Sequence, residues 1–133
     1  MRHFTVEEAN AALADLRPLV ERMVEQRRLH LEALDRQEEL DGHIRGNGGG
    51  IPPAALAESA AEVDRLAREL ARTVDEIAER GVQVKDVEGG LIDFPALRQG
   101  ETVLLCWKLG EDQIRYWHTL EGGFAARQEL PLD

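Results

Sequence analysis

The spacing of apolar residues changes near Gly81, and this change constrains the fold more than any other feature of the sequence. Before it, apolar residues recur every three or four positions, as on one face of an α-helix. From Val82 they alternate with a period of two, which is typical of β-strands. Five of the six aromatic residues lie between Phe94 and Phe124, and residues 5–80 contain no tryptophan or tyrosine. The sequence therefore predicts an α+β fold, with a helical region followed by a small antiparallel sheet.

The first predicted helix begins at Thr5 and extends to about Leu40. Thr5 and Glu8 have the spacing of a capping box, in which each side chain accepts a hydrogen bond from the other residue's backbone N–H. Pro18 lies inside this helix and removes one backbone hydrogen bond, so we expect a kink there or a break into two helices. The apolar stripe of this helix consists of Leu13, Leu16, Val20, Met23, Leu31 and Leu34.

A glycine-rich loop, residues 42–53, precedes the second predicted helix. A phosphate-binding loop would need a preceding strand and a following Gly-Lys-Ser/Thr, and neither is present, so we interpret the loop as a mobile connector. The second helix ends at Arg80 and Gly81, a cation and a glycine suited to a helix C-terminus. Its apolar residues alternate at spacings of four and three: Leu56, Ala60, Val63, Ala67, Leu70, Val74 and Ile77. Two such stripes joined by a loop predict an antiparallel helical hairpin with coiled-coil-like packing.

Four strands are predicted after the helices, and together they form an antiparallel β-meander. They cover about residues 82–87, 91–94, 102–108 and 113–118. The third strand has apolar side chains on both faces, so we expect the helices to cover one face. Either the C-terminal segment around Phe124 or a second subunit covers the other. We expect one domain over residues 1–133, with the hairpin in 5–80 and the meander and C-terminal tail in 81–133.

Charge and cysteine content exclude several classes of partner. Twenty-six acidic residues against sixteen basic residues give a formal net charge of −10, which repels phosphate backbones and anionic membrane surfaces. We therefore expect no nucleic-acid partner and no membrane partner. Cys106 is the only cysteine, which excludes an intrachain disulfide and fits a reducing compartment. No signal sequence and no run of about 18 apolar residues is present, so we expect a cytoplasmic protein.

A set of short motifs is distributed over nearly the whole chain: Phe4-Thr5, Glu8-Ala9-Asn10, Gly81-Val82, Lys85-Asp86, Gly90-Leu91-Ile92-Asp93-Phe94-Pro95, Leu105-Cys106-Trp107, Gly110-Glu111, Trp117-His118, Gly122 and Arg127. These motifs resemble those of bacterial proteins grouped as domain-of-unknown-function family 2203. The resemblance implies a prokaryotic cytosolic protein. It implies no activity, because the family has no assigned function.

Two aspartates form a candidate metal site. If Gly89 and Gly90 make a two-residue turn, Asp86 lies directly opposite Asp93 in the hairpin. Two opposed carboxylates destabilise a sheet unless a cation, a basic side chain or a shared proton intervenes. Mg²⁺, Ca²⁺ or Mn²⁺ would suit these oxygen ligands, and His118 is a possible third ligand. The alternative is that both aspartates are solvated or cap loop amides, although Asp93 lies within an apolar run, where a charge needs a partner.

Cys106 and His118 are a second candidate pair, because a thiol and an imidazole can form a nucleophilic dyad or half of a zinc site. A two- or four-residue connection centred on Gly110 and Glu111 would pair Val103 with His118. Strand alternation then places the thiol on the opposite face from the imidazole. Only a connection with an odd number of residues would bring them to one face. We therefore interpret Cys106 as a buried thiol that acts as a small hydrophobe.

Three functions remain open. The helices are longer than a small sheet needs to cover it, and this surplus length favours a protein-interaction or assembly module that forms a homodimer. The alternative is a divalent-metal-binding protein or metal-dependent enzyme that uses Asp86, Asp93 and His118. A third interpretation is a small-ligand binder with the tryptophan-rich sheet as a pocket wall. HExxH, CxxC and GxSxG motifs are absent, so whether the protein is an enzyme stays open.

Overall fold

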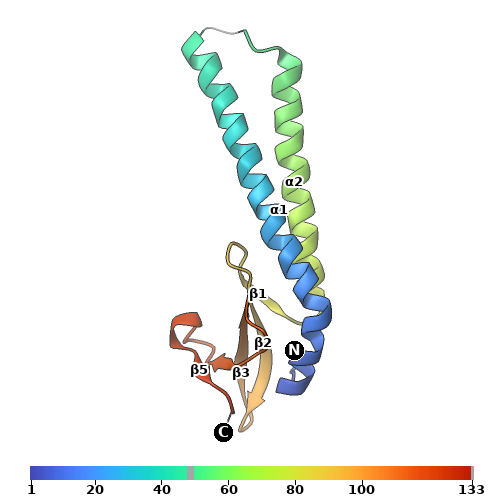
Figure 1. Cartoon of the computed structure of the whole chain (residues 1–133), viewed down its shortest axis with the longest axis vertical. Coiled ribbons are helices and arrows are strands. Elements are labelled where there is room, and N and C mark those ends of the chain that lie inside the picture. The colour runs from blue at the N-terminus through green and yellow to red at the C-terminus, as the bar shows by residue number, and fades with distance from the viewer. Residues whose placement is uncertain (48–49, 133) are drawn as a thin grey trace. The chain divides into compact units, whose positions relative to one another are not determined.

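The computed structural model describes residues 1–47 and 50–132 and contains two long helices followed by an antiparallel sheet (Figure 1). The predicted α+β arrangement is therefore confirmed. The elements are α1 (Val6–Asn47), α2 (Pro53–Glu79), β1 (Gln83–Asp86), β2 (Leu91–Arg98), β3 (Glu101–Lys108), β4 (Tyr116–His118), the 3₁₀ turn η1 (Phe124–Ala126) and β5 (Gln128–Glu129). No helix among these described residues is both long enough and apolar enough to cross a membrane.

The chain packs as two compact units, and the division cuts across both helices. The first, which we call the sheet unit, consists of residues 1–24 and 73–133. The second, which we call the hairpin, consists of residues 25–72. The expectation of a single domain over residues 1–133 stays a prediction.

Helix α1 begins with the predicted capping box. The Thr5 N–H donates to the Glu8 carboxylate at 2.9 Å, and the Glu8 N–H donates to the Thr5 hydroxyl at 3.0 Å. The helix then runs through Pro18 without interruption to Asn47. Of the two expected outcomes, the break into two helices therefore does not occur, and the kink stays a prediction. Pro18 and Ala14 are both exposed. Water can therefore bond the Ala14 carbonyl that loses its partner, and the helix continues.

Both ends of the predicted loop over 42–53 belong to helices. Helix α1 includes residues 42–47, and α2 already begins at Pro53. Residues 48 and 49, on which part of the predicted loop falls, lie outside the described residues. Proline occupies the first position of α2, where its missing N–H costs no intrahelical hydrogen bond.

The sheet has five strands in the order β1-β2-β3-β4-β5, all antiparallel. The predicted meander is present with one additional short strand, β5, at the C-terminal end. Strand β2 continues through Pro95 to Arg98, where a loop was expected. Proline is tolerated because pairing with β1 begins only at Asp93, which leaves this part of β2 at an edge. The Pro95 carbonyl there accepts the Phe4 N–H at 2.7 Å.

Strand alternation divides the sheet into an apolar face and a mixed face. The apolar face carries Ile92, Phe94, Ala96, Val103, Leu105, Trp107 and Trp117, which are all buried. Phe4, which precedes α1, packs there, and the Phe4 and Phe94 rings meet edge to face with centroids 5.2 Å apart. Figure 1 shows the start of α1 and the C-terminal segment on opposite sides of the sheet. The C-terminal segment therefore lies over the mixed face, which carries Asp93, Cys106 and His118.

Candidate functional site

The first candidate site is an apolar face on the hairpin. The buried contact line between its helices contains Ala33 of α1 and Leu66 of α2. Leu34 and Ala67 each follow a contact residue by one position, and are turned away from it by about 100°. Because the helices are antiparallel, these two rotations place the Leu34 and Ala67 side chains on the same side of the helix pair. The hairpin face, as we call it, consists of Leu31, Leu34, Leu56, Ala60, Val63, Ala67 and Leu70.

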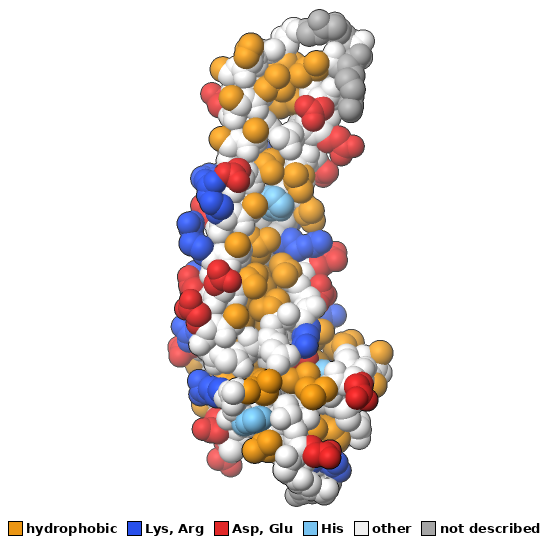
Figure 2. All heavy atoms as spheres, turned by 180° about the vertical axis from the view of Figure 1, so that it is seen from behind, with side chains coloured by type: hydrophobic (Ala, Val, Ile, Leu, Met, Phe, Trp, Pro, Cys, Tyr) orange, Lys and Arg blue, Asp and Glu red, His pale blue; other side chains and the backbone are white. Residues whose placement is uncertain are grey.

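The hairpin face is incompletely covered. Leu31 is 42% exposed, Ala60 is exposed, and the other members are half-buried. The predicted stripe of α2 is therefore displaced from the contact line, where Leu66 and Thr73 are buried instead of Ala67 and Val74. Figure 2 shows one side of the hairpin on which hydrophobic side chains follow one another, with charged side chains at both margins.

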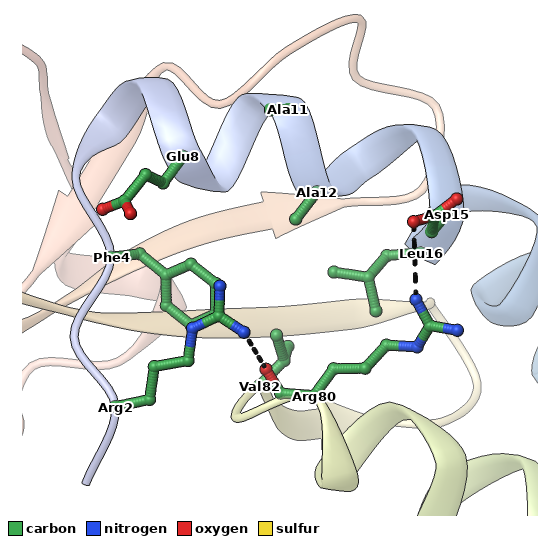
Figure 3. A pocket seen from close by; sticks show the side chains of 9 residues that line it. All are labelled: Arg2, Phe4, Glu8, Ala11, Ala12, Asp15, Leu16, Arg80 and Val82. Atoms are coloured by element: carbon green, nitrogen blue, oxygen red, sulfur yellow. Dashed lines mark hydrogen bonds and ion pairs between the residues drawn. The ribbon is translucent and has the colours of Figure 1, made fainter.

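A shallow pocket in the sheet unit lies beside the start of α1 and the end of α2 (Figure 3). Its charged side chains already have partners. The Arg2 guanidinium donates to the Arg80 carbonyl at 3.4 Å, and the Arg80 guanidinium lies 3.7 Å from the Asp15 carboxylate. Glu8 accepts the Thr5 N–H. We assign this pocket no ligand, because its polar groups are engaged with one another.

The second candidate site is a buried polar cluster on the mixed face of the sheet. Asp93 on β2, Cys106 on β3 and His118 on β4 are each no more than 2% exposed. One possible ligand atom from each residue lies within 4.8 Å of the other two. Asp93 and Cys106 are directly paired across β2 and β3. The three side chains converge because neighbouring strands present them on the same face.

Hydrogen bonds fix the orientation of the His118 ring. Its Nδ1 lies 2.8 Å from the Thr119 carbonyl oxygen, and its Nε2 lies 2.9 Å from Asp93 Oδ2. A carbonyl oxygen only accepts hydrogen bonds, so Nδ1 carries a proton. Nε2 and Oδ2 then share one proton, which leaves the His118–Asp93 pair with no net charge. Burial raises the pKa of Asp93, and the adjacent His118 opposes this rise.

Cys106 is flanked by a second ion pair. The Arg127 guanidinium lies 3.9 Å from Cys106 Sγ and 3.1 Å from the Glu111 carboxylate. It also stacks on the Tyr116 ring, 3.9 Å from the centroid. Burial raises the pKa of the Cys106 thiol to about 11, and the Asp93 charge adds to the rise while Arg127 opposes it. The thiol of the free protein is therefore protonated at neutral pH.

The predicted pairing of Asp86 with Asp93 is wrong. Strand β1 has an irregular register, in which Gln83 pairs with Asp93 and Asp86 pairs with Leu91. The Asp86 carboxylate instead accepts the N–H groups of Glu88 and Gly89, both at 3.2 Å. It therefore caps the turn, as the alternative interpretation of this residue expected. Of the three predicted metal ligands, the structure brings together Asp93 and His118 but not Asp86.

The predicted separation of Cys106 from His118 is also wrong. His118 pairs with Leu104, not Val103, so thiol and imidazole share a face. The cause is the segment 109–115, which is held by distant residues instead of forming a short hairpin. The Ile114 N–H donates to the Asn10 side chain at 2.8 Å, and Arg17 donates to two carbonyls of the segment. Strand β4 consequently begins only at Tyr116.

Sequence reasoning did not predict that Glu111 and Arg127 lie beside the buried cluster. The Glu111 carboxylate accepts the Lys108 N–H at 2.7 Å as well as Arg127. No spacing rule connects residues 16 positions apart in a loop and a C-terminal segment. The charge of Asp93 within an apolar run predicted a partner for that residue, which is His118, but gave no signal for Glu111 or Arg127.

Comparison with known protein families identifies a match over most of the chain. A family model described as an uncharacterized conserved protein (DUF2203) matches residues 2–130, a stretch that contains the buried cluster and the hairpin face. No curated protein and no solved structure matches the chain.

Proposed function

Since the chain belongs to the DUF2203 family, which carries no assigned activity, we propose from its surface that the protein is an assembly module that associates with a second copy of itself. The observation that carries this proposal is the half-exposed hairpin face. Its α2 members alternate at spacings of four and three, which is the repeat by which helices pack side by side. A second copy offers the same repeat in the same length of helix.

The small interior of the hairpin supports the proposal. Ala33 and Leu66 are the only buried apolar side chains among the described residues of 25–72. A two-helix unit with so few buried side chains gains little from the hydrophobic effect. Pairing two hairpin faces in a two-fold arrangement would bury the half-exposed leucines and valine of both copies.

The charge of the hairpin also permits self-association. It carries ten acidic and seven basic residues, a formal charge of −3, whereas the rest of the chain carries −7. Ion pairs within the hairpin, such as that between Arg36 and Glu62 at 2.6 Å, place its basic side chains next to acidic ones. Two hairpins therefore repel each other less than two sheet units do.

The test is the molar mass of the purified full-length chain, measured by light scattering and sedimentation velocity across a dilution series. We expect a dimer for the wild type. The double variant Ala60→Glu/Ala67→Glu places two charges on the hairpin face and should be monomeric at the same concentrations. The matched control is Ala57→Glu/Ala61→Glu, which alters exposed alanines of the same helix away from that face and should remain dimeric.

Two results would contradict the proposal. A monomeric wild type at every concentration would contradict self-association. A dimer of unchanged affinity in the Ala60→Glu/Ala67→Glu variant, with circular dichroism showing that its helices are intact, would contradict the hairpin face as the dimer surface.

The alternative function depended on paired sheet carboxylates. Asp86 and Asp93 are separated by the register of β1, and Asp86 is engaged by turn amides. We therefore do not propose a Mg²⁺, Ca²⁺ or Mn²⁺ site at these two residues, nor an enzyme that depends on one.

A further inference from the structure

We propose that Asp93, Cys106 and His118 bind a divalent transition-metal ion of Zn²⁺ type. The site is independent of the hairpin face, since all three residues belong to the sheet unit. It also differs from the site predicted from sequence, because a thiolate replaces a carboxylate among the ligands.

The geometry of the sheet supports this assignment. Each of the three side chains offers a ligand atom that lies within 4.8 Å of the other two. Ligands of a tetrahedral ion, each about 2.0–2.3 Å from the metal, lie at comparable separations. The three residues are on adjacent paired strands, which hold side chains more rigidly than loops do.

An unpartnered buried oxygen points independently to a ligand. Asp93 Oδ1 is buried and no described residue meets hydrogen-bond geometry to it, although the Cys106 thiol adjoins this carboxylate. A buried acceptor without a partner destabilises the fold. A metal ion would supply the missing partner to the carboxylate, whereas the His118 hydrogen bond engages only Oδ2.

The orientation of His118 suits a metal ligand. Its Nδ1–H donates to the Thr119 carbonyl, so the lone pair available for a metal is on Nε2, which faces Asp93. Metal-binding histidines commonly donate their other ring N–H to a carbonyl or carboxylate, which fixes the tautomer and the ring plane.

The charges of the site balance for a divalent ion. On binding, the proton shared by His118 and Asp93 and the thiol proton of Cys106 leave to solvent. A carboxylate, a thiolate and a neutral imidazole then neutralise two positive charges. Arg127 donates to Cys106 Sγ and would stabilise the thiolate, while Glu111 neutralises the guanidinium.

The donor set selects the class of metal. Thiolate and imidazole ligands favour Zn²⁺ and similar ions over Mg²⁺ and Ca²⁺, which prefer oxygen. Three protein ligands are the number found in zinc sites that keep a fourth position for water or substrate. The site therefore has the ligand count of an open centre.

The decisive experiment titrates Co²⁺ into the untagged full-length protein, purified with a chelator and then freed of it. Tetrahedral Co²⁺ bound by a thiolate gives visible d–d bands and a sulfur-to-cobalt charge-transfer band. Cys106 is the only cysteine in the chain, so this band can arise only from the proposed site. We expect both features at one ion per chain and their loss on adding Zn²⁺. A folded wild type without the charge-transfer band would overturn the proposal.

A matched pair of variants tests the ligand set. Asp93→Asn removes a proposed ligand, and Asp86→Asn makes the same change at a turn carboxylate outside the cluster. We expect Asp93→Asn to weaken Zn²⁺ binding by more than about 100-fold, since even residues that only orient ligands cost 10–100-fold, and Asp86→Asn to leave it unchanged. Equal Zn²⁺ affinities of the two variants would contradict the assignment. If Asp93→Asn does not fold, the wild-type cobalt spectrum alone decides.

Discussion

The hairpin and the sheet unit differ in where their apolar side chains lie. Nineteen of the twenty-one buried apolar residues of the described chain belong to the sheet unit, and two belong to the hairpin. The hairpin also buries the amide oxygen of Gln26 without a hydrogen-bond partner. The sheet unit is therefore stabilised by its own interior, whereas the hairpin has the composition of a surface that needs a partner. A regular repeat of apolar residues does not by itself give a pair of helices a hydrophobic core.

The largest expected difference between the two regions is the cost of removing one buried side chain from each. Phe94→Ala deletes a fully buried ring that packs on Phe4, and we expect a loss of about 3–5 kcal/mol in the free energy of unfolding. Leu66→Ala in the hairpin should cost about 2 kcal/mol, because its sparsely packed surroundings leave a smaller cavity. Urea denaturation followed by circular dichroism measures both. Equal costs would mean that the hairpin is as well packed as the sheet unit.

A smaller effect is expected where α1 approaches the β1–β2 turn. Gly90 has φ +68°, and a Cβ there would lie 2.8 Å from Leu109 Cβ and 3.0 Å from Val20. We expect Gly90→Ala to destabilise the protein by about 2–3 kcal/mol, from backbone strain and steric conflict together.

The control for Gly90 is Gly100→Ala. Gly100 also has positive φ, but nothing lies within 4 Å of a Cβ there. We expect Gly100→Ala to lower the free energy of unfolding by only about 1–2 kcal/mol, from the backbone conformation alone. Thermal denaturation of the two variants measures the difference. Identical melting temperatures would show that a Cβ at Gly90 meets no steric conflict with α1.

The capping box should contribute about 1 kcal/mol, so Thr5→Ala lowers stability by that amount and Thr5→Ser restores it.

The hydrogen bond from the Thr5 N–H is the main cause that lowers the pKa of Glu8 below 4.5. A lowered folded-state pKa stabilises the protein above pH 4.5, and this stabilisation is lost as the pH falls through the lowered value. Wild type should therefore lose more stability on acidification than Glu8→Gln, as measured by urea midpoints across that range. Parallel pH profiles would contradict this role of Glu8.

The smallest effect is expected for the ion pairs of the hairpin. Arg36 and Glu62 are 53% and 41% exposed, so solvent screens their attraction. We expect Glu62→Gln to change the free energy of unfolding by less than about 1 kcal/mol, and added salt to remove most of that difference. A larger loss in denaturant titrations would mean that charges, rather than a partner surface, hold the hairpin together.

Local patterns predicted most of the fold. The change of period near Gly81 separated helices from strands, and the Thr5 and Glu8 spacing located the start of α1. Local patterns failed where distant residues decide the outcome. Asn10 and Arg17 hold the segment before β4 and thereby set its register. The same long-range contacts explain why Cys106 could not be assigned to the candidate site from sequence, although Asp93 and His118 were.

Both tryptophans of the chain are in the sheet unit, and the hairpin has none. Intrinsic fluorescence excited at the indole band therefore comes only from the sheet unit, while the far-ultraviolet signal is dominated by the two helices. The Trp107 indole donates to the Glu111 carbonyl at 3.0 Å, and Glu111 in turn holds the arginine beside Cys106. Emission from the Trp107 ring therefore reports structural changes next to the buried polar cluster. It does not report unfolding of the hairpin alone.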